Sequence, residues 1–242
     1  MYRDGGFKMS LDSILDKIDE INNSETIREF VITGGEPTAD IDTLKIIVER
    51  CKKQVFINTT LPAKNAKEAI SLINELDIVH GVNISRQFGK LNGIYHGISM
   101  QPMIESIDKP IRINVMRTED WKEELECFMD KFITKPNMLL NLREDYRAVD
   151  KFNLKVRNEV VDYLANKYVF IGSSGCMVCN ADTFVNAENG KYINYHRGIE
   201  HSCVRFEERT YVNDVIVRPD GKCFDDWDWK NELTKETIEN IK

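Results

Sequence analysis

Residues 30–38 read FVITGGEPT, a short β-rich run followed by two glycines, a carboxylate and a proline. The run from Phe30 to Thr33 is too short for a buried helix and predicts a strand that stops at Gly34. Glycines at a strand end leave backbone N–H and C=O groups accessible to a ligand. Glu36 adds an acceptor suited to an ammonium group, and Pro37 fixes the direction of the chain. An ordinary strand-to-helix turn is the alternative.

Helical and strand-like patterns alternate around this turn. Apolar residues at helical spacing predict helices over 11–21, following an N-cap at Ser10, and over 41–51, 66–73, 121–132 and 154–164. Short β-rich runs predict strands over 55–60, 78–84, 111–116 and 138–142. This order favours right-handed crossovers and a parallel sheet, either open or closed into a barrel.

Ligand-binding residues of such α/β folds belong at the carboxyl ends of the strands and in the loops that follow them. The candidates are residues 34–37, 58–60, 85–87, 114–117 and Arg143. For Arg143 and its neighbour Glu144, a surface ion cluster is an equal alternative.

Composition limits the class of protein. The chain has 242 residues, of which 42% are hydrophobic, and its formal net charge is −7. These values favour a globular protein and argue against a nucleic-acid partner, which clustered Lys and Arg would attract. No run of about 18 apolar residues predicts a membrane span, and the first residues lack the apolar stretch of a signal peptide. We expect a cytoplasmic protein without a membrane partner.

Six cysteines in a reducing compartment favour metal ligands or buried thiols over disulfides. Cys176 and Cys179 are separated by two residues, a spacing that lets both sulfurs reach one metal, and Cys203 and Cys223 complete four thiolates. His196 and His201 could replace a thiolate at a zinc site, and a redox pair with two buried thiols is the remaining alternative. Helical periodicity fades after residue 167, so we expect domains over 1–167 and 168–242.

The Gly34-Gly35-Glu36-Pro37 string, at the end of a strand in an α/β series, resembles the radical S-adenosylmethionine superfamily. The resemblance covers about the first 150 residues and implies a partial (β/α)6 barrel in which this turn contacts the amino group of S-adenosylmethionine. Ser85 resembles the polar residue at the end of the family's fourth strand, near the ribose or carboxylate of the ligand. Asn114 lies in a segment that resembles the fifth strand and could face the cofactor.

The chain departs from this family in one respect. The Cys-x3-Cys-x2-Cys loop that holds the catalytic 4Fe–4S cluster is absent, and residues 2–10 resemble the segment that normally follows it. We therefore expect a barrel without its first strand. Either the cluster loop is encoded upstream, or the protein has kept the scaffold without the radical chemistry.

Residues 215–223 resemble the SPASM or twitch extensions that carry auxiliary clusters, although Gly221 is closer to Cys223 than is usual there. The resemblance implies an auxiliary 4Fe–4S cluster on Cys176, Cys179, Cys203 and Cys223. A complete enzyme of this type would need an electron donor and would abstract hydrogen from its substrate with a 5′-deoxyadenosyl radical. The substrate is unknown, with peptides and proteins among the candidates.

Two other functions remain open. One is a non-catalytic scaffold or binding protein in which the C-terminal cysteines hold structural zinc. The other is an unrelated α/β enzyme whose Gly34 to Pro37 turn matches by chance.

Overall fold

The structure is a computed structural model that describes residues 10–86, 100–118, 120–144, 154–174, 181–196, 204–206, 209–211, 215–224 and 232–239. The chain divides into two compact units. The first comprises residues 1–30, 42–55 and 200–242, and the second comprises residues 31–41 and 56–199. The second unit contains the Gly34 to Pro37 turn, the first of the candidate site segments.

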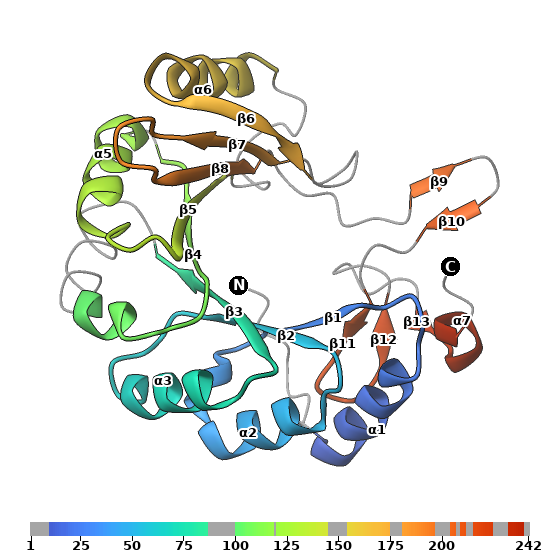
Figure 1. The fold of residues 1–242 in the computed structure, drawn as a ribbon. Coiled ribbons are helices and arrows are strands. Elements are labelled where there is room, and N and C mark those ends of the chain that lie inside the picture. Colours follow the sequence, from blue (N-terminus) through green and yellow to red (C-terminus); the bar gives the residue numbers. More distant parts are fainter. Residues whose placement is uncertain are drawn as a thin grey trace. The chain divides into compact units, whose positions relative to one another are not determined.

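Helices and strands alternate through the first 167 residues (Figure 1). In chain order they are α1 (Leu11–Asn22), β1 (Glu29–Ile32), the 3-10 helix η1 (Pro37–Ala39), α2 (Ile41–Arg50), β2 (Gln54–Thr59), α3 (Ala66–Glu75), β3 (Val79–Ser85), β4 (Ile111–Met116), α5 (Trp121–Lys131), β5 (Met138–Arg143) and α6 (Leu154–Lys167). Residues 100–105 add a further helical turn. The predicted helices and strands are confirmed, with ends that differ by a few residues.

Strands β6 (Val169–Ser174), β7 (Ala181–Val185) and β8 (Tyr192–His196) follow α6. The eight strands form one sheet in the order β1-β2-β3-β4-β5-β8-β7-β6. The pairs β3–β4, β4–β5 and β5–β8 are parallel, whereas β6–β7 and β7–β8 are antiparallel. The α/β class is therefore confirmed, and residues 169–196, beyond the expected division at residue 167, extend the same sheet.

One face of this sheet is covered by helices. In Figure 1, α3 and α5 lie on the same side of β3, β4 and β5. The strand residues on the covered face are almost completely buried, among them Ile84, Ile113 and Leu140 at 0% exposure. Leu125 and Phe128 of α5 are buried as well. Their burial supplies the main driving force for forming this unit, at roughly 1.5–3 kcal/mol for each large aliphatic or aromatic side chain.

The other unit joins the two ends of the described chain. It contains α1, residues 42–50 of α2, and the C-terminal secondary structure of the described residues. The latter comprises the pair β9 (Val204–Phe206) and β10 (Arg209–Tyr211), the sheet β11 (Ile216–Val217), β12 (Cys223–Phe224) and β13 (Glu232–Leu233), and helix α7 (Lys235–Glu239). The expected N-cap is confirmed, because the Ser10 side chain accepts a hydrogen bond from the Ser13 backbone.

The start of α1 is fixed against the turn between β11 and β12. The Ser10 backbone N–H donates to the carbonyl of Pro219 over 2.9 Å. A Cβ placed on Gly221 would come within 2.6 Å of the Ser13 Cβ, and Gly221 has a φ of +80°. Only glycine satisfies both this close approach and this backbone angle.

No helix in the described ranges is both long and apolar enough to cross a membrane.

Candidate functional site

The Gly34 to Pro37 turn adopts a backbone conformation that requires its glycines. Gly34 has a φ of +92° and Gly35 a φ of +51°, both in the region that other residues avoid. Both glycines are exposed, and a Cβ on either one would meet no atom of the described part of the chain within 4 Å. The backbone angle, and not a lack of space, therefore explains why glycine occupies these positions.

Glu36 holds the turn in place through five hydrogen bonds. Its Oε1 accepts from the backbone N–H and hydroxyl of Thr38 at 3.1 and 2.7 Å, and from the Thr59 hydroxyl at 2.5 Å. Its Oε2 accepts from the backbone N–H and hydroxyl of Thr60 at 2.7 and 2.5 Å. Thr59 ends β2 and Thr60 follows it, so the carboxylate ties the turn after β1 to the end of β2.

This network limits what Glu36 can do chemically. A carboxylate has about four lone-pair positions, and five donors already occupy them. Burial alone would raise the pKa of Glu36, but the hydrogen bonds from Thr59, Thr60 and Thr38 outweigh burial and lower the pKa below 4.5. Glu36 is therefore a stable anion that positions the turn, and the expectation that it offers a ready acceptor to a ligand ammonium group does not suit this geometry.

Arg86 joins the ends of the next strands. Its Nη1 donates to the carbonyls of Thr60 and Ser85 at 2.5 and 2.9 Å, and its backbone N–H donates to the carbonyl of Asn114 at 2.8 Å. Arg86 is only 8% exposed, and its Nε has no hydrogen-bond partner within the described ranges. Burial lowers the pKa of Arg86, and the nearby Glu36 carboxylate partly offsets this effect.

Ser85 and Asn114 lie next to each other on paired strands. They are aligned in the parallel ladder of β3 and β4, with Ser85 exposed and Asn114 half-buried. The Asn114 Oδ1 accepts a hydrogen bond of 2.7 Å from Asn141 on β5. A second amide pair links β3 to β2, where Asn83 donates to Asn58 over 2.6 Å. Amide side chains therefore run across neighbouring strands on the face that the described helices leave open.

Arg86 lies within the predicted candidate range 85–87, whereas sequence reasoning missed Asn141 and Thr38 as parts of this site. For Asn141 a signal existed, because an amide interrupts the apolar run of residues 138–142. For Thr38 the signal was its position directly after the turn, which many surface residues share. Their roles depend on contacts between strands that the sequence alone does not specify.

Of the four predicted cysteine ligands, Cys176, Cys179 and Cys203 lie outside the described residues, as does His201. Cys223 lies on β12, is 1% exposed, and has its pKa raised to about 11, chiefly by burial. His196 is the last residue of β8. Within the described ranges, no three His, Cys, Asp or Glu side chains gather as a metal site.

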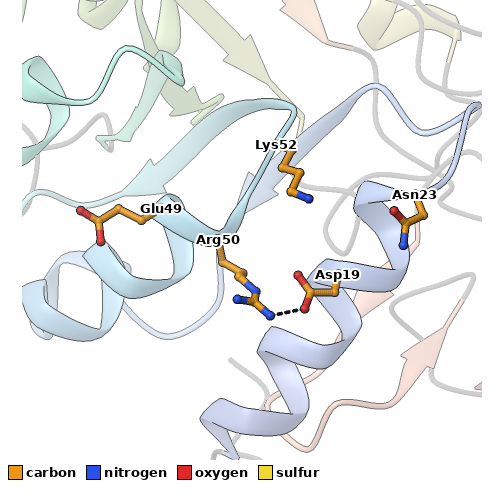
Figure 2. A pocket seen from close by; sticks show the side chains of 5 residues that line it. All are labelled: Asp19, Asn23, Glu49, Arg50 and Lys52. Carbon is orange, nitrogen blue, oxygen red and sulfur yellow. Dashed lines mark hydrogen bonds and ion pairs between the residues drawn. The ribbon is translucent and has the colours of Figure 1, made fainter.

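The unit formed by the chain ends carries a polar hollow (Figure 2), lined by Asp19, Asn23, Glu49, Arg50 and Lys52. Arg50 pairs with Asp19 there, as Figure 2 shows. Two cations and two carboxylates leave the hollow without net charge. It has no feature of a catalytic site beyond its shape.

The arrangement of the Gly34 to Pro37 turn, Arg86 and the amide row gives the second unit the most developed candidate site in the described part of the chain. Comparison of the sequence with models of known protein families and with curated proteins gives no match.

Proposed function

We propose that this chain is a radical S-adenosylmethionine-type protein whose Gly34 to Pro37 turn binds the methionine end of S-adenosylmethionine. The observation that carries this proposal is the geometry of the turn. Two exposed glycines with positive φ follow β1, and the carboxylate of Glu36 fixes the backbone behind them through Thr38, Thr59 and Thr60.

The residues of the site divide the work of binding. The ammonium group of the ligand bonds to backbone carbonyls of the exposed turn, because Glu36 is already occupied by hydroxyl and amide donors. Glu36 is thus a positioning residue. Ser85 and Asn114 present a hydroxyl and an amide to the more polar parts of the ligand, the ribose and the carboxylate.

The cysteines of this chain would serve only an auxiliary 4Fe–4S cluster, because the cysteine loop of the catalytic cluster is absent from the sequence. In a complete enzyme of this type, a separate catalytic cluster would supply the electron needed to cleave S-adenosylmethionine and thereby to remove a hydrogen atom from the substrate. Cys223 is 1% exposed and its pKa is raised to about 11, chiefly by burial, so a bound metal would have to displace the proton from this thiol. Cys176, Cys179 and Cys203 complete the proposed auxiliary site.

The direct test is equilibrium dialysis of the anaerobically purified chain with S-adenosylmethionine. We expect the wild type to bind and the Gly35→Val variant to lose at least tenfold in affinity, because valine cannot adopt a φ of +51° without strain. Gly172→Ala, in β6 and with open space around the added Cβ, is the matched control and should keep full affinity. Equal affinity in wild type and Gly35→Val would overturn the proposal.

Iron, sulfide and zinc analysis of the same preparation separates the two metal alternatives. About four irons per chain, lost in Cys176→Ala, support the auxiliary cluster. Stoichiometric zinc without iron favours the scaffold with a structural zinc site. An electron paramagnetic resonance signal that shifts on addition of S-adenosylmethionine indicates a cluster with an open iron, a result the missing cysteine loop does not lead us to expect.

A further inference from the structure

The open face of the sheet carries an ordered set of polar side chains. The ladders place Ser85, Asn114, Asn141 and Asn194 in one row across β3, β4, β5 and β8. A second row lies two residues further toward the carboxyl ends and aligns Met116, Arg143 and His196. Residues aligned in parallel ladders point to the same face, so the two rows form one surface.

The charged side chains that the described residues place on this surface are positive. On the open face of β3, β4, β5 and β8, the described residues include two guanidinium groups, Arg112 and Arg143, and no carboxylate. Glu144, the nearest carboxylate in sequence, instead accepts from Arg117 at 2.6 Å and from the Tyr195 hydroxyl at 2.8 Å. It therefore does not neutralise Arg143.

Arg143 has no counterion in the described part of the chain, where its guanidinium makes neither a hydrogen bond nor an ion pair. It is nevertheless partly buried. Burial lowers the pKa of Arg143, and repulsion from Arg112 lowers it further. A half-buried cation beside another cation is an unfavourable arrangement that an anion would relieve.

Asn141 supplies a second, independent observation beside Arg143. It is 3% exposed, its Nδ2 donates to Asn114, and its Oδ1 is buried without a hydrogen-bond partner among the described residues. Asn141 and Arg143 are two residues apart on one face of β5, about 7 Å along the strand. The surface thus places an unsatisfied acceptor next to an unsatisfied cation.

We propose that this surface binds the substrate through a carboxylate held by Arg143 and an adjacent N–H group that donates to the Oδ1 of Asn141. Amino acids with a blocked amine and the carboxyl terminus of a peptide carry this pair of groups. The identification of this ligand as the substrate rests on the proposed S-adenosylmethionine function, whereas the binding site itself does not.

Titration of the full isotope-labelled chain with three small probes, followed by nuclear magnetic resonance at constant ionic strength, tests the pairing of groups. N-acetylglycine carries the carboxylate and the N–H, acetate has only the carboxylate, and N-acetylglycinamide lacks the carboxylate. We expect N-acetylglycine to bind at least fivefold more tightly than acetate and at least tenfold more tightly than the amide. Equal affinities for N-acetylglycine and N-acetylglycinamide would overturn the proposal, as would tighter binding of inorganic phosphate than of N-acetylglycine.

Variants of Arg143 and Asn141 test whether these two residues cause the preference for N-acetylglycine. Arg143→Met should weaken N-acetylglycine at least tenfold, and Asn141→Leu should remove the preference for N-acetylglycine over acetate. Lys122→Met removes an exposed cation of α5 and should change neither value. If Arg143→Met folds normally and binds N-acetylglycine with unchanged affinity, the proposed site is wrong.

S-adenosylmethionine dialysis on the same variants separates this inference from the proposed function. Binding of N-acetylglycine without binding of S-adenosylmethionine would contradict the proposed function and support the anion site. Binding of S-adenosylmethionine alone, with no response to N-acetylglycine, would contradict the anion site only.

Discussion

The two faces of the sheet in β4 and β5 are built from alternate residues of the same strands, yet they differ in burial and polarity. Ile111, Ile113 and Val115 of β4 lie on the covered face and are at most 1% exposed. Arg112 and Asn114, their immediate neighbours, point to the open face with a charge and an amide. Parallel strands covered on both faces are usually apolar throughout. The alternation shows that one face forms the core while the other carries polar and charged side chains.

The largest expected effect distinguishes these faces directly. Leu140→Ala removes a fully buried side chain from the covered face and should lower the free energy of unfolding by about 2–5 kcal/mol. Leu139→Ala, the adjacent residue on the half-buried open face, should lower it by about 1 kcal/mol or less. Urea denaturation followed by circular dichroism measures both. Equal losses would mean that the open face is packed as tightly as the core.

Glu36→Gln should destabilise the turn by about 1–2 kcal/mol, a value reduced by the partial exposure of the site. The amide nitrogen of the glutamine is a donor, and it would replace one carboxylate oxygen that now accepts hydrogen bonds either from Thr38 and Thr59 or from Thr60. Because the folded state lowers the pKa of Glu36, its contribution is complete above about pH 4.5 and disappears as the pH falls through the lower folded value. Urea midpoints at pH 7 and pH 3 should therefore differ more in wild type than in Glu36→Gln. Glu49→Gln, an exposed carboxylate on α2, is the control.

Gly34→Ala should cost about 1 kcal/mol, because alanine is strained at a φ of +92° although its Cβ meets no neighbour. Gly172→Ala has open space without a positive φ and should change the unfolding free energy by less. A thermal unfolding scan of the two variants compares them. Similar melting temperatures would show that the turn relaxes at no cost.

The smallest expected effect on the free energy of unfolding is a gain in stability and not a loss. Asn141→Leu should leave the ligand-free protein unchanged or stabilise it by up to about 1 kcal/mol, since it removes a buried acceptor without a partner. Asn114 is half-exposed and can replace the lost hydrogen bond with water. A clear loss of stability in urea would indicate that Asn141 serves the fold and not a ligand.

The order of elements could be predicted from the sequence because each element carries its own period. The strand at 111–116 alternates apolar with polar residues, the strand at 138–142 is a short apolar run, and the helix at 121–132 places Trp121, Leu125 and Phe128 on one buried stripe. Residues 169–196 were assigned to a cysteine-rich segment instead. Their pairing with β5 depends on contacts across more than 50 residues, such as Leu139 with Tyr192, and no local pattern encodes these contacts.

Part of the candidate site could also be predicted from the sequence, because the ends of the strands could be predicted. Gly34, Gly35 and Ser85 follow from the rule that ligand sites lie at strand ends. The hydrogen bonds that occupy the Glu36 carboxylate could not be predicted, because Thr38 belongs to its own turn whereas Thr59 and Thr60 come from the end of β2, more than 20 residues away. Likewise, the lack of a counterion for Arg143 in the described part of the chain depends on which residues the neighbouring strands place beside it, and the sequence alone does not specify them.

The contact between Ser10 and Pro219 has a consequence for synthesis on the ribosome. The partner of α1 lies about 200 residues downstream, so at roughly 5–20 residues per second the helix emerges about 10–40 s before the hairpin that receives it. The intervening unit has its own sheet and can fold during that interval. The unit made from the chain ends is completed last, and a nascent chain released before residue 219 would leave the start of α1 without the hairpin that it contacts, so that chaperones could bind there.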